Sequence, residues 1–153
     1  MGISKSLTGI IMTIWTFFSM VILPLATLSA FAKGVNIQGQ VVVVKIVGLN
    51  VEMIFILGLF AMFLTAMSYS VSEKNSAIIT FLKYVIAAYY EWTWAEGVKD
   101  MDLNVGGQYV HVGVYLGVWI IMVIAASLLT GFLKALHKYL KAKKEEEEEE
   151  EKE

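Results

Sequence analysis

The chain has 153 residues, of which 58% are hydrophobic, and its mean hydropathy is +0.67. This composition is too apolar for a soluble domain, and the length is too short for a large transporter. All twelve basic residues are lysines, which argues against the bidentate phosphate contacts of a nucleic-acid-binding protein. The absence of cysteine excludes disulfides and thiolate metal sites, and together with the many Lys and Glu residues it gives a thermophile-like composition.

The net charge of −2 combines two unlike regions. Residues 145–153 hold eight glutamates and one lysine, whereas residues 1–144 hold eleven lysines against six acidic residues. We therefore expect a transmembrane domain over 1–144 followed by a solvated acidic cytoplasmic tail over 145–153. A helical tail and a cytoplasmic docking segment are the alternatives.

Uncharged stretches of membrane-spanning length dominate the chain. About 20 apolar residues form a helix that crosses the roughly 30 Å hydrocarbon core of a bilayer, and residues 53–72 supply that length without a charge. Comparable stretches lie before and after it. We predict an all-α integral membrane protein with four transmembrane helices, over approximately 7–32, 43–70, 77–94 and 109–133, the first of them kinked at Pro24.

Two of these spans have a second interpretation. Residues 7–32 resemble a secretory signal, because Lys5 provides a basic start and Ala30-Phe31-Ala32 resembles a cleavage site. The β-branched run from Val41 to Val51, which contains Lys45 and Asn50, fits a strand outside the membrane as well as the first turns of the second helix. For both segments we favour the membrane helix.

Lysine counting predicts the orientation. With four spans, eight of the eleven lysines in residues 1–144 fall on the side that holds both termini. We therefore expect a multi-pass protein of the cell membrane with both termini in the cytoplasm.

Two short sequence patterns recur in the same order. Asn36-Ile37-Gln38-Gly39-Gln40 returns as Asn104-Val105-Gly106-Gly107-Gln108, and Thr16-Phe17-Phe18 returns as Thr80-Phe81-Leu82. This predicts an internal repeat of two tandem two-helix hairpins, related by a pseudo-two-fold axis along the membrane normal. We interpret the Asn-x-x-Gly element as turn chemistry rather than a binding motif.

Ionisable and polar residues inside a membrane mark candidate sites, since a charge at the bilayer centre costs about 2.5–3.5 kcal/mol on insertion scales. We favour structural pairing, of Lys45 with Glu52 or Glu91, over ion translocation. His111 and His137 lie 26 residues apart and cannot share a metal, and we predict no metal or cofactor. Gly113 and Gly117 form a G-x-x-x-G motif that predicts close helix packing. The candidate intramembrane polar residues are Lys45, Asn50, Glu52, Lys83, Glu91 and His111.

No nucleophile–base pair or phosphate-binding loop is present in the sequence, so we expect a protein that is not an enzyme. The leading hypothesis is a non-catalytic structural or accessory subunit of a multi-subunit or homo-oligomeric membrane complex. Its partners would be the lipid bilayer and other membrane subunits or copies of itself, with no nucleic acid. The alternative is a small channel or transporter that moves ions or small solutes along a polar path between repeats or protomers.

Overall fold

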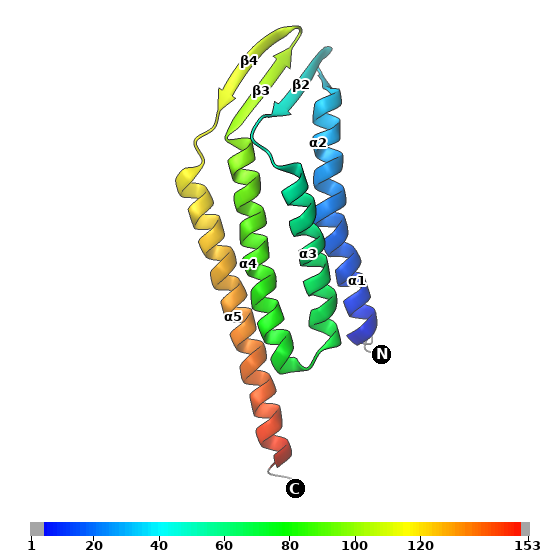
Figure 1. Ribbon diagram of the computed structural model, residues 1–153, viewed down its shortest axis with the longest axis vertical. Coiled ribbons are helices and arrows are strands. Elements are labelled where there is room, and N and C mark those ends of the chain that lie inside the picture. Colours follow the sequence, from blue (N-terminus) through cyan, green and yellow to red (C-terminus); the bar gives the residue numbers. More distant parts are fainter. Residues whose placement is uncertain (1–4, 151–153) are drawn as a thin grey trace.

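Four helical columns stand side by side and carry a small β-sheet at one end (Figure 1). This computed structural model describes residues 5–150. The first column consists of α1 (Lys5–Phe17), the π-helix η1 (Phe18–Ile22) and α2 (Leu23–Lys33). The other three columns are α3 (Val51–Ser70), α4 (Glu73–Val98) and α5 (Gly117–Glu150). The start of α1, the turn between α3 and α4 and the end of α5 lie opposite the sheet, and we call these two ends the terminal end and the sheet end.

Three of the described helical segments are long and apolar enough to cross a membrane by length and composition. They are Lys5–Lys33, Val51–Ser70 and the part of α5 up to Glu148. The remaining column, α4, has 26 residues and charged side chains along its length, including Lys83 and Glu91. The chain is therefore mostly helical, with three candidate apolar spans.

The sheet end is a four-stranded antiparallel sheet in the order β1-β2-β3-β4. Each of its two hairpins follows a helical column, and the two inner strands pair with each other. The strands are β1 (Val35–Ile37), β2 (Gln40–Ile46), β3 (Asp100–Val105) and β4 (Gln108–Gly113). The sheet thus joins the first half of the chain to the second.

The sheet corrects the all-α prediction. Residues 43–46, expected as the start of the second helix, continue strand β2, and α3 begins only at Val51. The β-branched residues of β2 pair with residues 101–105, about 60 positions away, and such a partner leaves no local signal in the sequence. The helix start is fixed instead by Asn50, whose side-chain oxygen accepts a hydrogen bond from the Met53 amide at 2.9 Å. Likewise, residues 109–113 form β4, and α5 begins at Gly117.

The repeated Asn-x-x-Gly elements form equivalent turns. The Asn36 side chain accepts a hydrogen bond from the Gly39 amide at 3.0 Å, and Asn104 does the same for Gly107 at 3.1 Å. Both central residues of each two-residue turn have positive φ, as a type I′ hairpin requires. In the sheet order β1-β2-β3-β4, a shift by two strands brings the first β-hairpin onto the second, with β1 in the place of β3. A two-fold axis relating the two β-hairpins would instead bring β1 to the place of β4. The pseudo-two-fold relation expected from the sequence therefore does not describe the two β-hairpins.

Small residues allow the helical columns to approach closely. A Cβ at Gly9 would lie 2.8 Å from the Cβ of Tyr69, which brings α1 against α3. Between α4 and α5, a Cβ at Gly131 would lie only 2.3 Å from the Cβ of Tyr84. Buried hydroxyl groups complete these contacts, with Thr16 and Thr65 facing each other across α1 and α3 at 3.4 Å.

Pro24 creates a junction in the middle of the first column. It has no N–H, so it cannot donate the usual i→i−4 hydrogen bond to the carbonyl of Met20, and the π-helix η1 directly precedes it. The Tyr90 hydroxyl, from α4, donates a hydrogen bond to that Met20 carbonyl at 2.9 Å. On the other side, Gly58 of α3 leaves room for the same segment, since a Cβ there would lie 2.9 Å from the Met20 oxygen.

We expect Tyr90→Phe to lower the free energy of unfolding by about 1–3 kcal/mol, because it removes the hydroxyl donor and leaves the Met20 carbonyl unsatisfied. Reversible unfolding of the purified protein in detergent measures the change. Tyr89→Phe is the matched control, since Tyr89 is 50% exposed, and it should change stability by no more than about 0.5 kcal/mol. Equal effects of the two substitutions would contradict this role of Tyr90.

Candidate functional site

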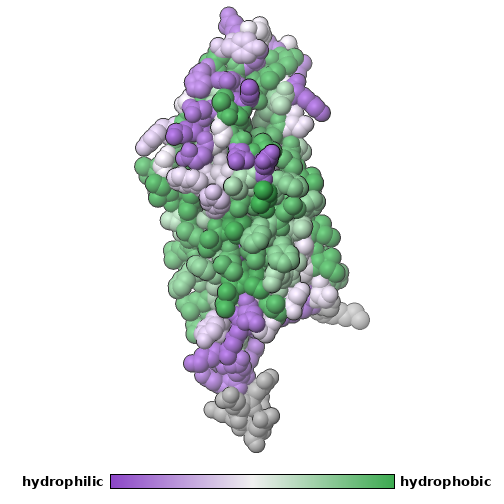
Figure 2. All heavy atoms as spheres, viewed as in Figure 1, coloured by the Kyte–Doolittle hydropathy of each residue, from purple (hydrophilic) through white to green (hydrophobic). Residues whose placement is uncertain are grey.

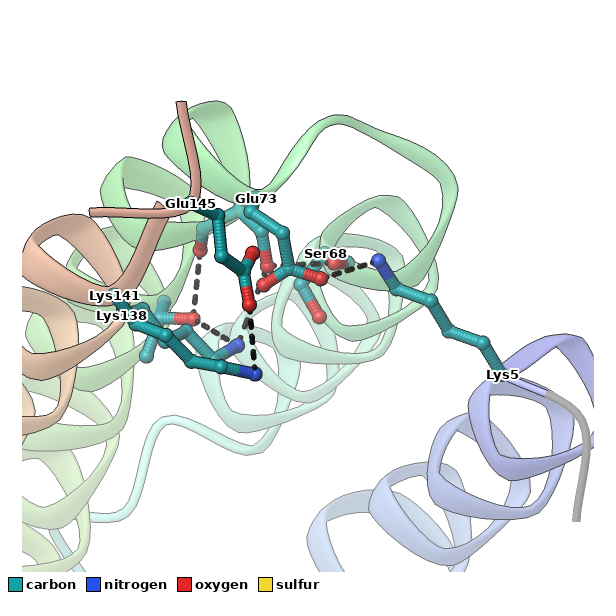
Figure 3. Close-up of polar contacts among 8 residues, drawn as sticks. Lys5, Ser68, Glu73, Lys138, Lys141 and Glu145 are labelled. Atoms are coloured by element: carbon teal, nitrogen blue, oxygen red, sulfur yellow. Dashed lines mark hydrogen bonds and ion pairs between the residues drawn. The ribbon is translucent and has the colours of Figure 1, made fainter. Parts of the chain in front are cut away.

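Polar side chains from α3, α4 and α5 meet at the terminal end of the helices (Figure 3). The Lys138 ammonium, half-buried against α4, donates to the Ser76 hydroxyl at 3.2 Å and to the Thr80 hydroxyl at 3.0 Å. Ser76 in turn donates to the backbone carbonyl of Ser68 at 2.7 Å. This chain of hydrogen bonds fixes Lys138 at the junction of three helices.

A cavity of about 460 Å³ adjoins Lys138. Three lysines and one histidine line it, together with polar and apolar residues from α1, α3, α4 and α5. Lys134 donates to the Tyr84 hydroxyl at 2.6 Å, and its ammonium lies 5.3 Å from the centre of the Tyr84 ring. We call this the basic cavity, defined by Lys83, Lys134, His137 and Lys138.

The carboxylates at the terminal end pair with lysines outside the basic cavity. Glu73 accepts a hydrogen bond from Lys5 at 2.6 Å, and this contact holds the pKa of the Glu73 carboxyl below its usual range. Glu146 pairs with Lys74. Glu145 lies one helical turn from Lys141 with an N–O distance of 3.5 Å (Figure 3). The helix α5 itself continues through the acidic segment up to Glu150, which is the helical alternative for these residues.

Glu91 lies apart from this cluster, nearer to the sheet end of α4. Both of its carboxylate oxygens lie 3.0 Å from the Ser127 hydroxyl of α5, which donates to the carboxylate. A smaller cavity of about 140 Å³ adjoins Glu91, lined otherwise by Trp119, Ile120, Val123 and Ile124. Within the described residues 5–150, Glu91 has no cationic partner.

His111 and Lys45 lie in the sheet, not in a helix. Lys45 of β2 is opposite Asp102 of β3, and His111 of β4 is opposite the same aspartate on the other side. The His111 Nδ1 lies 2.8 Å from a carboxylate oxygen of Asp102, and its Nε2 lies 3.7 Å from Asp100. The hydrogen bond to Asp102, helped by the charges of both aspartates, raises the pKa of His111 above its ordinary value.

The six candidate polar residues thus occupy three separate places. Lys45, Asn50, Glu52 and His111 lie at the sheet end, where Asn50 caps α3 and Glu52 occupies its first turn. Glu91 lies between α4 and α5, and Lys83 lines the basic cavity. The pairings that we expected for Lys45, with Glu52 or Glu91, are not among the ion pairs of the described residues, where Asp102 is its neighbour instead.

Gly113 and Gly117 do not share a helix face, because Gly113 ends β4 and Gly117 begins α5. No atom lies within 4 Å of a Cβ built at Gly113. Close approach occurs instead at Gly9, Gly58, Gly97 and Gly131, which have no G-x-x-x-G spacing. Within the part of the chain that the structure describes, the sequence motif therefore does not mark a contact between helices.

Sequence reasoning recognised Lys83 but missed its neighbours in the basic cavity. Lys134 and Lys138 are not among the six candidate polar residues, although they are four residues apart and share one face of α5. Both are in fact turned toward the hydroxyl groups of α4. The spacing of these two lysines beside the small residue Gly131 was the available signal.

Comparison of the chain with protein-family models, curated proteins and solved structures finds no match.

We expect Asp102→Asn to lower the pKa of His111, because it removes the strongest acceptor for the protonated ring. A raised folded pKa means that the contact stabilises the sheet at pH below the unfolded value of about 6.5 and is lost as pH rises through the folded pKa. Titration of the His111 ring by NMR, with His137→Gln for assignment, measures the shift. Asp100→Asn is the matched control and should have a smaller effect, since Asp100 is 3.7 Å away.

Proposed function

We propose that the chain is an integral membrane protein whose four helical columns cross the bilayer, and that it is a non-catalytic structural or accessory subunit of a membrane complex. One observation carries this proposal: an apolar band covers the helices between a polar sheet end and a charged terminal end (Figure 2). The band includes exposed Ile14 (63%), Ile78 (62%) and Trp119 (70%). Such a surface is unfavourable in water and is matched by the hydrocarbon of lipid tails.

The internal contacts support the same environment. Small residues and buried hydroxyl groups, such as Gly9, Gly131 and the pair Thr16 and Thr65, form the contacts between columns. Helices in lipid associate through close packing and interhelical hydrogen bonds, because lipid provides little hydrophobic drive for their association. The edges of the four-stranded sheet would be unfavourable in hydrocarbon, which suits a sheet outside the bilayer.

The orientation that we propose places the terminal end in the cytoplasm. Lys5, Lys74, Lys83 and the five lysines of α5 lie in the half of the molecule toward the terminal end, whereas Lys33, Lys45 and Lys99 lie near the sheet end. The positive-inside rule assigns the lysine-rich side to the cytoplasm. The sheet would then face the exterior.

The subunit role is supported by α5. In its apolar window only 6% of the residues are buried, compared with 39% in α3, and the α5 contacts run along α4 alone over most of its length. Trp119 and Leu129 project from it with 70% and 60% exposure. An outer helix of this kind suits packing against another membrane subunit or a second copy of the chain. The channel alternative has no comparable support, because the candidate polar residues lie in three separate places.

The topology can be tested with single cysteines, since the chain has none of its own. We expect a membrane-impermeant maleimide to label Gln108→Cys, at the β3–β4 turn, in intact cells. Ser72→Cys, in the turn between α3 and α4, should be labelled only after permeabilisation. Labelling of both positions in intact cells, or extraction of the protein from membranes by alkaline carbonate, would contradict the proposal.

The subunit role can be tested by photo-crosslinking in native membranes. A benzophenone amino acid in place of Trp119 or Leu129 should give a discrete protein adduct, identified by mass spectrometry as another subunit or as this chain. The same probe at Ile14, on the exposed side of α1, is the control position for a lipid-facing side chain. If the two α5 positions give only the uncrosslinked monomer, the subunit role fails while the membrane assignment stands.

A further inference from the structure

The basic cavity concentrates positive charge without a carboxylate in its lining. Lys83 and Tyr84 come from α4, and Lys134, His137 and Lys138 come from α5, so the charged groups converge from two helices. Ammonium groups brought together in this way repel one another, and the repulsion is stronger beside an apolar band than in water. An anion in the cavity would remove that cost.

The lysines of the basic cavity have hydrogen-bond donors to spare. An ammonium group has three donors, and Lys134 uses one on Tyr84 while Lys138 uses two on Ser76 and Thr80. Among the side chains described, those of residues 5–148, Lys83 has neither a hydrogen bond nor an ion pair from its ammonium. These acceptors are neutral hydroxyl groups, so they orient the lysines without cancelling their charge.

The nearby carboxylates do not fill the cavity. Glu73 attracts Lys138 at longer range, but its hydrogen bond is with Lys5. Glu145 pairs with Lys141, and Glu146 pairs with Lys74. The positive charge at the cavity is therefore available to an anion from outside the chain.

The geometry points to a binding site in the basic cavity for the phosphate group of an anionic membrane lipid, held by Lys83, Lys134 and Lys138. Lysine binds phosphate as a point charge, and basic pockets between membrane helices bind anionic headgroups. Met12 and Leu133 line the same cavity and are exposed apolar residues, so they would contact the acyl chains. This inference rests on the proposed membrane location and adds a ligand to it.

The test compares lipid binding to the purified full-length chain in detergent by native mass spectrometry. Phosphatidylglycerol provides the anionic phosphate, phosphatidylcholine provides a zwitterionic headgroup, and inorganic phosphate is the free anion. We expect a preference for phosphatidylglycerol over phosphatidylcholine, and K83Q/K134Q should weaken phosphatidylglycerol binding by about tenfold or more. K143Q/K144Q is the matched control, since it removes two exposed lysines of the same helix outside the cavity, and it should retain binding within about twofold.

Several outcomes would overturn the site. These are an absence of headgroup preference, equal losses in the two double variants, and saturable binding of inorganic phosphate that competes fully with the lipid. If K83Q/K134Q fails to fold, the single variant K83Q tests the site. Among the described residues, the Lys83 ammonium makes no hydrogen bond, so this substitution breaks none. A protein that labels and crosslinks as a membrane subunit but shows no headgroup preference disproves this site and leaves the proposed function intact.

Discussion

The position of the first helical column depends on the carbonyl of Met20. Pro24 cannot donate to it, so this carbonyl needs a partner from elsewhere in an apolar interior, where an unsatisfied oxygen costs several kcal/mol. Tyr90 supplies the donor, and Gly58 allows α3 to approach the same segment. One backbone oxygen therefore lies at the point where the first column meets both α3 and α4.

The sheet imposes a second constraint at the other end of the columns. Pairing of β2 with β3 joins the loops that follow the first and third columns, so the two halves of the chain cannot separate there. At the terminal end, ion pairs and hydrogen bonds to hydroxyl groups join the helices. Examples are the ion pair of Lys5 with Glu73 and the hydrogen bonds of Lys138. The apolar middle thus lies between two polar ends that hold it together by different means.

The sequence predicts a helix where the signal lies within the segment itself. It does not predict structure that depends on a partner segment distant in the chain. The apolar run of 53–72 identified α3 by length alone, and Asn-x-x-Gly was correctly interpreted as turn chemistry. The β-branched residues of β2 were misassigned, because only pairing with β3 makes them a strand. The G-x-x-x-G motif did not predict the contacts between helices within the described chain, for the same reason. A glycine allows close approach only where another helix lies beside it, as α4 with Tyr84 lies beside Gly131 of α5. For the candidate site, Lys83 could be recognised by its depth in an apolar segment, whereas the tertiary placement of Lys134 and Lys138 could not.

The charged groups between the helices differ in how their charge is accommodated, and this difference separates structural from binding roles. Glu91 is a single carboxylate whose two oxygens accept hydrogen bonds from the Ser127 hydroxyl of the neighbouring helix. The basic cavity holds three lysines, and the hydrogen bonds of Lys134 and Lys138 go to neutral hydroxyl groups, which leave the repulsion between the ammonium groups uncompensated. In the proposed site, a bound phosphate group would offset the repulsion between the three ammonium groups. For this reason, on the membrane location proposed above, the phosphate group of a lipid is the counterpart that we propose for the cavity.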